Sequence, residues 1–146
     1  MAETTDKFKN KIEEAHTWED MQRVLKELPR VTLRQRTEEL SEKYNKSFSV
    51  ICGLADIPES TFYAVMNGTR TPKKEMIIKI AFALGASMEE LNEMLKLAKL
   101  KELYAKNTED AIIIYGMKNG LDLVDIDMLL KSQNAKMRLL KEKDNE

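Results

Sequence analysis

The stretch SFSVICGLADIPESTFYAVMNGTRTP, residues Ser47 to Pro72, decides the fold of this chain of 146 residues. A helix starts at Ser47 or Ser49, because serine is favoured as a helix N-cap. The sequence Asp56-Ile57-Pro58 predicts a turn, since proline interrupts a helix but suits the first turn of the next one. Glu59 to Asn67 follows as a second helix, which Gly68 ends because glycine readily takes a left-handed conformation. The stretch therefore predicts two short helices across a tight turn, followed by a basic loop.

Further helices are predicted on both sides of this stretch. Thr32 caps a preceding helix, and the residues expected on its buried face are Leu33, Thr37, Leu40 and Tyr44. After the stretch, Lys73 begins a core helix that Gly85 ends, and the apolar residues of its main face are Met76, Ile77, Ile80, Ala81 and Leu84. Ser87 and Glu90 form a capping box that opens another helix, and this module of residues 32–100 ends near Leu100.

The N-terminal residues 1–31 predict a separate helical hairpin. Residues 4–15 place apolar side chains at helical spacing, Phe8, Ile12 and Ala15. Thr17 caps a second helix, which Pro29 ends. We expect Trp18 to be a packing residue at the start of this second helix, and His16 to be a solvated loop residue.

Residues 101–146 predict a second helical hairpin with a charged tail, KEKDNE. Asn107 and Thr108 precede a helix that Gly120 ends, and Asp122 caps the next one. Ile112 to Ile114 would also suit a buried strand, but the helix is favoured because the sequence offers caps on both sides and no partner strand. We therefore expect an all-α protein whose three parts, residues 1–31, 32–100 and 101–146, are able to pack as one unit.

Composition narrows the function classes. Charged residues make up 34% of the chain, and five Gly and three Pro are too few for a loop-rich or disordered protein. The sequence contains no apolar run of the roughly 18 residues needed to cross a membrane, and its start lacks the order of a signal peptide, so we expect a soluble, cytoplasmic protein. The single Cys cannot form a disulfide within the chain, and one Cys with one His does not give the ligand spacing of a metal site. We expect no metal and no cofactor.

The net charge of −1 argues against a protein that coats nucleic acid indiscriminately. The charge is unevenly placed, however, because residues 23–46 hold seven basic and four acidic residues. A positive segment therefore leads into the central stretch. Adjacent acid pairs, Glu13-Glu14, Glu38-Glu39 and Glu89-Glu90, face different directions on a helix, as solvated residues do, and no nucleophile lies beside a base in any recognisable motif. We therefore expect no enzyme.

The central stretch resembles the phage-repressor-like helix-turn-helix family, of the Cro and lambda-repressor type. Its framework positions match without a gap, at Ile51, Cys52, Ile57, Phe62, Val65, Gly68 and Pro72. The resemblance covers about Leu33 to Leu95 and implies a five-helix lambda-repressor-like core. The two flanking hairpins are similar to those of a group of small bacterial proteins that carry this motif at the centre, and that likeness implies no defined activity.

The resemblance implies a sequence-specific, DNA-binding transcription regulator of bacterial type. In this family the second helix of the motif, here Glu59 to Asn67, lies in the major groove of double-stranded DNA. The residues implied to face the bases are Glu59, Ser60 and Tyr63. Those implied to contact phosphates are Ser47, Ser49, Asn67, Thr69, Arg70, Lys73 and Lys74, with Arg34 and Arg36 beside the footprint. A homodimer would place two such helices about 34 Å apart on a palindromic site, with the apolar terminal hairpins as its surface.

Several positions depart from the family pattern. Phe48 stands where the family often has Gln, and the alignment makes it an exposed aromatic residue. Asp56 replaces the usual turn glycine, and Gly53 weakens its helix by about 1 kcal/mol relative to alanine. The second helix of the motif, Glu59 to Asn67, is the expected recognition helix, and it contains no basic residue; the first one after it is Arg70. An alternative function is therefore a protein-interaction adaptor that keeps the fold, with Phe48 and Tyr63 as an exposed aromatic spot for a protein partner.

Overall fold

The computed structural model describes residues 5–28 and 31–140, and over these residues all regular secondary structure is α-helical. The prediction of an all-α protein is confirmed. The alternative of a strand at Ile112 to Ile114 is wrong, because these residues lie inside a helix. No helix within the described ranges is long and apolar enough to span a membrane. The expected helix end at Pro29 and the charged tail of residues 141–146 lie outside the described residues.

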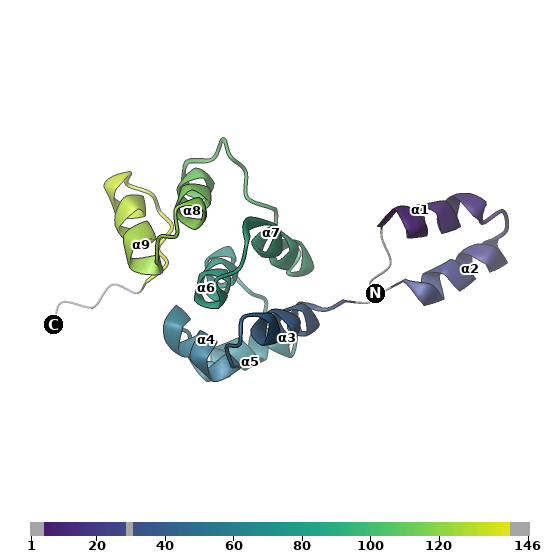
Figure 1. The fold of residues 1–146 in the computed structure, drawn as a ribbon, viewed down its shortest axis with the longest axis horizontal. Helices are drawn as coiled ribbons and strands as arrows, with labels where there is room; N and C mark the ends of the chain where they lie inside the picture. The colour runs from purple at the N-terminus through teal and green to yellow at the C-terminus, as the bar shows by residue number, and fades with distance from the viewer. Residues whose placement is uncertain (1–4, 29–30, 141–146) are drawn as a thin grey trace. The chain divides into compact units, whose positions relative to one another are not determined.

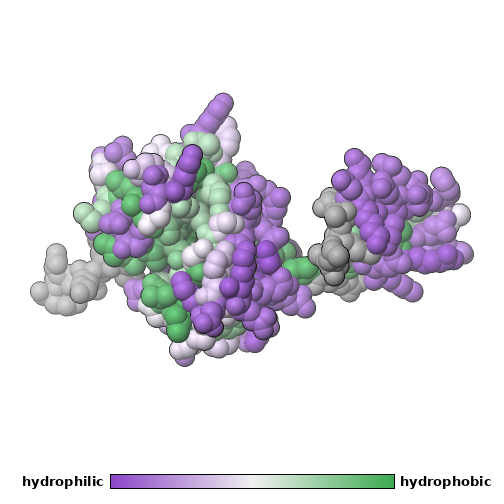
Figure 2. Space-filling view, viewed as in Figure 1, coloured by the Kyte–Doolittle hydropathy of each residue, from purple (hydrophilic) through white to green (hydrophobic). Residues whose placement is uncertain are grey.

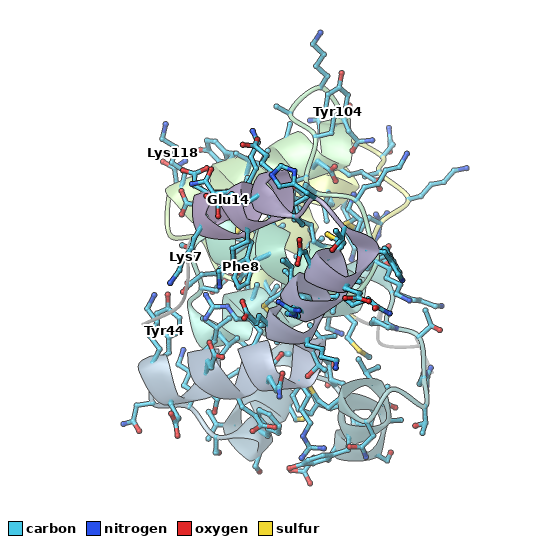
Figure 3. All side chains as sticks on the ribbon, turned by 90° about the vertical axis from the view of Figure 1, so that its right-hand side faces the viewer. Lys7, Phe8, Glu14, Tyr44, Tyr104 and Lys118 are labelled. Carbon is cyan, nitrogen blue, oxygen red and sulfur yellow. The ribbon has the colours of Figure 1, made fainter. Side chains whose placement is uncertain are left out.

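The chain divides into two compact units, residues 1–31 and 32–146. In the first unit, α1 (Thr5–Glu14) and α2 (Trp18–Glu27) form an antiparallel hairpin, drawn in purple in Figure 1. Phe8, labelled on α1 in Figure 3, and Val24 of α2 are each 8% exposed. As predicted, Thr17 caps α2 by accepting a hydrogen bond from the Asp20 amide at 3.0 Å.

Trp18 does not pack as the sequence predicts. Its side chain, at the first position of α2, is 67% exposed. Ile12 of α1 and Leu25 of α2 are also exposed. The hairpin therefore buries few apolar side chains, and the visible face of this unit in Figure 2 is mostly hydrophilic.

The second unit contains seven helices among its described residues. They are α3 (Leu33–Lys43), α4 (Phe48–Ala55), α5 (Glu59–Met66), α6 (Lys74–Leu84), α7 (Met88–Leu97), α8 (Thr108–Lys118) and α9 (Leu123–Ser132). Helix α6 packs against α4 and α7, α7 also contacts α3 and α8, and α8 pairs with α9 (Figure 1). A single hydrophobic cluster runs from Leu40 of α3 to Ile126 of α9 and Leu139 beyond it. The C-terminal hairpin therefore shares one core with α3–α7.

Most of the predicted helix starts are confirmed. Capping boxes open α3 at Thr32 and α7 at Ser87, while Asn107 and Asp122 cap α8 and α9. Of the two serines considered for α4, it is Ser47 that caps the helix. The helix expected to begin at Lys73 begins at Lys74, with Lys73 as its N-cap residue. Caps can be predicted because the interaction spans only three residues.

Glu90 is buried, contrary to the expectation of a solvated acid pair at Glu89-Glu90. Its carboxylate accepts hydrogen bonds from the Ser87 amide at 2.8 Å, from Lys43 Nζ at 2.7 Å and from the hydroxyl of Tyr44, labelled in Figure 3. Burial alone raises the pKa of Glu90, but these hydrogen bonds outweigh it and lower the pKa from 4.5 to about 2. The ionised carboxylate thus ties α3 to α7.

Carboxylates also attach the C-terminal segment to its hairpin. Glu109 of α8 accepts the Met137 amide at 2.6 Å, and the buried Asp127 of α9 accepts the Leu139 amide at 2.8 Å. Met137 and Leu139 are 7% and 1% exposed, so apolar burial and hydrogen bonding act on the same few residues. The segment after α9 is therefore held in a defined path.

Helices α8 and α9 approach closely at Gly116. A Cβ atom added at this position would lie 1.7 Å from Cδ1 of Ile126, which is fully buried. In contrast, a Cβ atom added at Gly53 of α4 would meet no atom within 4 Å. Packing therefore requires glycine at position 116 but not at position 53.

We predict opposite effects for the same substitution at these two glycines. Gly116→Ala should lower the free energy of unfolding by about 1–3 kcal/mol, because Ile126 must leave its rotamer in a packed core. Gly53→Ala should raise it by about 0.5–1 kcal/mol, because alanine reduces the backbone entropy of the unfolded chain. Urea unfolding followed by circular dichroism measures both values. Equal effects of the two substitutions would contradict the close approach of α8 and α9.

The low pKa of Glu90 makes part of the free energy of unfolding depend on pH in the acid range. Because its pKa is lower in the folded state, its contribution is complete above pH 4.5 and is lost as the pH falls toward 2. Glu90→Gln should remove about 2 kcal/mol of stability at pH 7 and make the decline between pH 5 and pH 2 shallower. The exposed neighbour provides a control, because Glu89→Gln should leave the pH profile of the wild type unchanged. Parallel acid profiles for all three proteins would contradict this role.

Candidate nucleic-acid interface

Helix α5 has one buried and one exposed face. Phe62, Val65 and Met66 are buried, as the spacing predicts for the first two of them. The three residues expected to face DNA bases, Glu59, Ser60 and Tyr63, are all exposed. Ser60 and Tyr63 follow one another at helical spacing along one side, and Glu59 lies beside them in the first turn. The structure therefore brings these three side chains together on one accessible surface.

The turn before α5 fixes the direction of this surface. Asp56 has φ 54° and ψ 50°, a left-handed conformation that aspartate adopts more easily than most residues. The amide of Ile57 donates to the carbonyl oxygen of Cys52 at 3.0 Å, and the Ile57 side chain is 6% exposed. Asp56 thus takes the positive φ that the sequence analysis expects this residue to tolerate. A hydrogen bond and a buried side chain thus hold α4 and α5 at a defined angle.

Phe48 is half-buried, which corrects the expectation of an exposed aromatic residue. Its ring packs edge-on against Phe62, with 4.9 Å between the ring centroids, and lies 5.9 Å from the ring of Tyr63. Phe62 and Tyr63 are themselves 5.8 Å apart. The start of α4 and the middle of α5 therefore share a three-ring cluster. Phe48 therefore braces α5 by aromatic packing.

Most of the residues expected to contact phosphates lie around the two ends of this pair of helices. Ser47 and Ser49 are exposed at the start of α4, and Ser47 Oγ accepts the Val50 amide at 3.2 Å. After α5, Thr69 donates its hydroxyl hydrogen to the Ala64 carbonyl at 3.1 Å, and Asn67 accepts a hydrogen bond from Arg34. These contacts order the helix ends.

The loop after α5 presents the basic residues. Gly68 has φ 79° and so reverses the chain, as the sequence predicts. Arg70 and Lys73 then follow as exposed cations. A loop that is fixed at both ends by helices presents its charges in a limited set of positions, which favours binding of a rigid polyanion.

Lys74 differs from the other residues that are expected to contact phosphates. Its ammonium group forms an ion pair with Asp110 of α8, whose side chain is only 4% exposed. The same carboxylate accepts the Tyr104 amide at 2.8 Å. Lys74 therefore links α6 to the C-terminal hairpin, and this role could not be predicted because Asp110 lies 36 residues away in sequence.

The two arginines of α3 also differ. Arg34 binds Glu38 at 2.8 Å and reaches Asn67 beyond the end of α5, so it lies beside the candidate interface. Arg36 instead contacts Glu93 of α7 and Glu39, at 3.0 Å from the latter. Sequence reasoning missed two further cations near the loop, Lys79 of α6 and Arg138 of the C-terminal segment. No sequence signal joins them to the motif, since only the fold brings them there.

The side chains of the candidate interface offer hydrogen-bonding groups for recognition of a binding partner. Burial raises the pKa of the Cys52 thiol, which keeps it protonated at neutral pH. Within the described ranges, no group of three or more His, Cys, Asp or Glu residues is placed to hold a metal ion. The exposed face of α5 supplies a carboxylate, a hydroxyl and a phenol, which are able to donate or accept hydrogen bonds.

Comparison with known proteins finds no match for this chain among protein-family models, curated proteins or solved structures.

Proposed function

We propose that this chain is a sequence-specific, DNA-binding transcription regulator of bacterial type. Helices α3–α7 would form a five-helix core of lambda-repressor type, and α5 would enter the major groove. The observation that carries this proposal is the exposed face of Glu59, Ser60 and Tyr63 on a helix fixed by the Asp56 turn and the three-ring cluster. Arg70 and Lys73 lie directly after this helix.

The proposed contacts follow from the chemistry of the exposed side chains. Glu59 would accept a hydrogen bond from a cytosine amino group, and Ser60 would bond to several bases. The Tyr63 ring offers apolar contact to a thymine methyl group, and its packing on Phe48 restricts the side-chain rotamers in advance. Because the helix lacks an arginine or lysine that would bind guanine, we expect an operator read mainly at C·G and A·T pairs by these three side chains.

The alternative function, a protein-interaction adaptor, has one observation in its favour. Val50 and Leu54 of α4 are 47% and 56% exposed, although apolar residues usually face the core. The exposed aromatic surface expected for this adaptor is smaller than predicted, because Phe48 is half-buried and Tyr63 is the more exposed ring. A protein that binds one stoichiometric partner through Val50 and Leu54 and binds no DNA would favour the adaptor.

We further propose that the protein is a homodimer joined through its N-terminal hairpin. Helices α1 and α2 have ten residues each, and isolated helices shorter than about 12–15 residues are marginally stable in water. Within residues 6–28, only Phe8 and Val24 are buried, while Ile12, Trp18 and Leu25 are exposed. A second copy of the hairpin would cover these three side chains by forming a symmetric helical bundle.

Charge reversal in the loop after α5 tests DNA binding. The double variant Arg70→Glu and Lys73→Glu should weaken binding to a selected operator roughly 100-fold, because two phosphate contacts become repulsive. Lys101→Glu, an exposed residue of the α7–α8 connection, makes the same type of change elsewhere and should have little effect. Fluorescence anisotropy with fragments selected from genomic DNA gives the affinities. Specific binding that survives the double reversal would contradict the proposed interface.

Trp18 provides a direct test of the dimer, because it is the single tryptophan of the chain. Its fluorescence should shift to shorter wavelength as concentration rises, since association removes a 67% exposed ring from water. Trp18→Ala should make the protein monomeric in sedimentation experiments at concentrations where the wild type is dimeric. Tyr104→Ala, which removes a 60% exposed ring from the second unit, should not. A dimer that persists without Trp18 would contradict the N-terminal interface.

A further inference from the structure

We propose that Arg138 belongs to the DNA interface, where it completes a cleft that binds a backbone phosphate beside α5. This inference rests on the proposed function. It assigns a role in DNA binding to the C-terminal segment, which lies outside the five-helix core and more than sixty residues beyond the recognition helix. The shared chemistry of the cleft is phosphate binding, and the observations favour DNA as its source.

The cleft has a volume of about 260 Å³ and lies next to the recognition helix. Pro58 and Thr61 line it from the start of α5, and Arg70 and Lys73 line it from the loop after that helix. Lys79 of α6 and Arg138 form the rest of its basic lining. Four cations from three separate parts of the chain therefore surround one space.

The position of Arg138 is determined by its neighbours. Met137 and Leu139, on either side of it, are buried, and their amides bind the carboxylates of Glu109 and Asp127. Both hydrogen bonds that Arg138 donates within its own segment come from Nη1, and the one to the Met137 carbonyl is 2.9 Å long. A guanidinium group has five N–H donors, so it is able to bind a phosphate while it keeps these two bonds.

The charges of the cleft favour an anion. Asp56 and Glu75 also line it, but the four cations outnumber these two acids. Lys79 donates to the backbone carbonyl of Asp56 at 3.4 Å, which keeps its ammonium group beside the turn. Arginine binds phosphate oxygens through paired N–H groups, and this geometry is the specific contribution of Arg138.

DNA fits the location of the cleft. A helix in the major groove lies between two sugar-phosphate backbones, so cations beside its first turn are placed near phosphates. Pro58 and Thr61 belong to the same turns of chain that present Glu59 and Ser60. The C-terminal hairpin would then influence DNA binding, because Glu109 and Asp127 determine where Arg138 lies.

The salt dependence of operator binding tests this contact. Arg138→Gln retains a donor for the local carbonyls and removes the charge, so it should weaken binding about 5- to 10-fold and reduce the slope of log K against log salt by about 1. Arg138→Lys should retain the slope and recover part of the affinity. Lys136→Gln, an exposed residue of the same segment, should match the wild type. Thermal unfolding of each variant verifies that the fold is intact.

The outcomes separate this contact from the proposed function. If the wild type binds its operator and Arg138→Gln binds with equal affinity and slope, the Arg138 contact is overturned and the DNA-binding function stands. If the wild type binds no DNA, both are overturned. A third arm uses inorganic pyrophosphate. If pyrophosphate stabilises the wild type but not Arg138→Gln, while operator binding is the same in both, the cleft binds a free anion and the DNA contact is overturned.

Discussion

The burial of α6 is the constraint on which the second unit depends. Ile77, Ile78, Ile80, Ala81 and Leu84 are all fully buried, so α6 is apolar on most of its circumference. A helix of this kind is stable only when other elements cover it, and α4 and α7 do so directly. The α4–α5 pair is therefore placed by the same contacts that form the core. This gives α5 a rigid base while its other face remains open to solvent.

Buried carboxylates connect the remaining parts to this core. Glu90 joins α7 to α3, and Asp110 joins α8 to Lys74 of α6. Each carboxylate accepts hydrogen bonds from several groups, one of them on another helix, and such partners lower the cost of burying a charge. Because each contact requires one particular partner, it helps to select one arrangement of the helices. The path of the C-terminal segment, and with it the position of Arg138, follows from the same type of contact.

The errors of the sequence interpretation share a physical origin. Local spacing predicts a packed Trp18 and a solvated Glu90, but the burial of each side chain depends on which elements lie opposite it. The resemblance predicts an exposed Phe48, whereas Phe62 and Tyr63 provide aromatic partners for its ring. The resemblance predicts that Lys74 contacts phosphate, as its neighbouring cations do, although its partner is a distant carboxylate. In every case the deciding neighbour lies outside the window that a sequence pattern covers.

The sequence encodes most helices and their ends locally, because caps, turn residues and apolar spacing act within a few positions of the chain. Ser47, Asp56 and Gly68 illustrate this, since each conformation follows from its own side chain and its closest neighbours. It also determined which face of α5 is exposed, through the period of its apolar residues. In contrast, packing between helices places the C-terminal hairpin in the main core and brings Lys79 and Arg138 beside Arg70. These relations arise from packing between distant segments, and no local pattern encodes them.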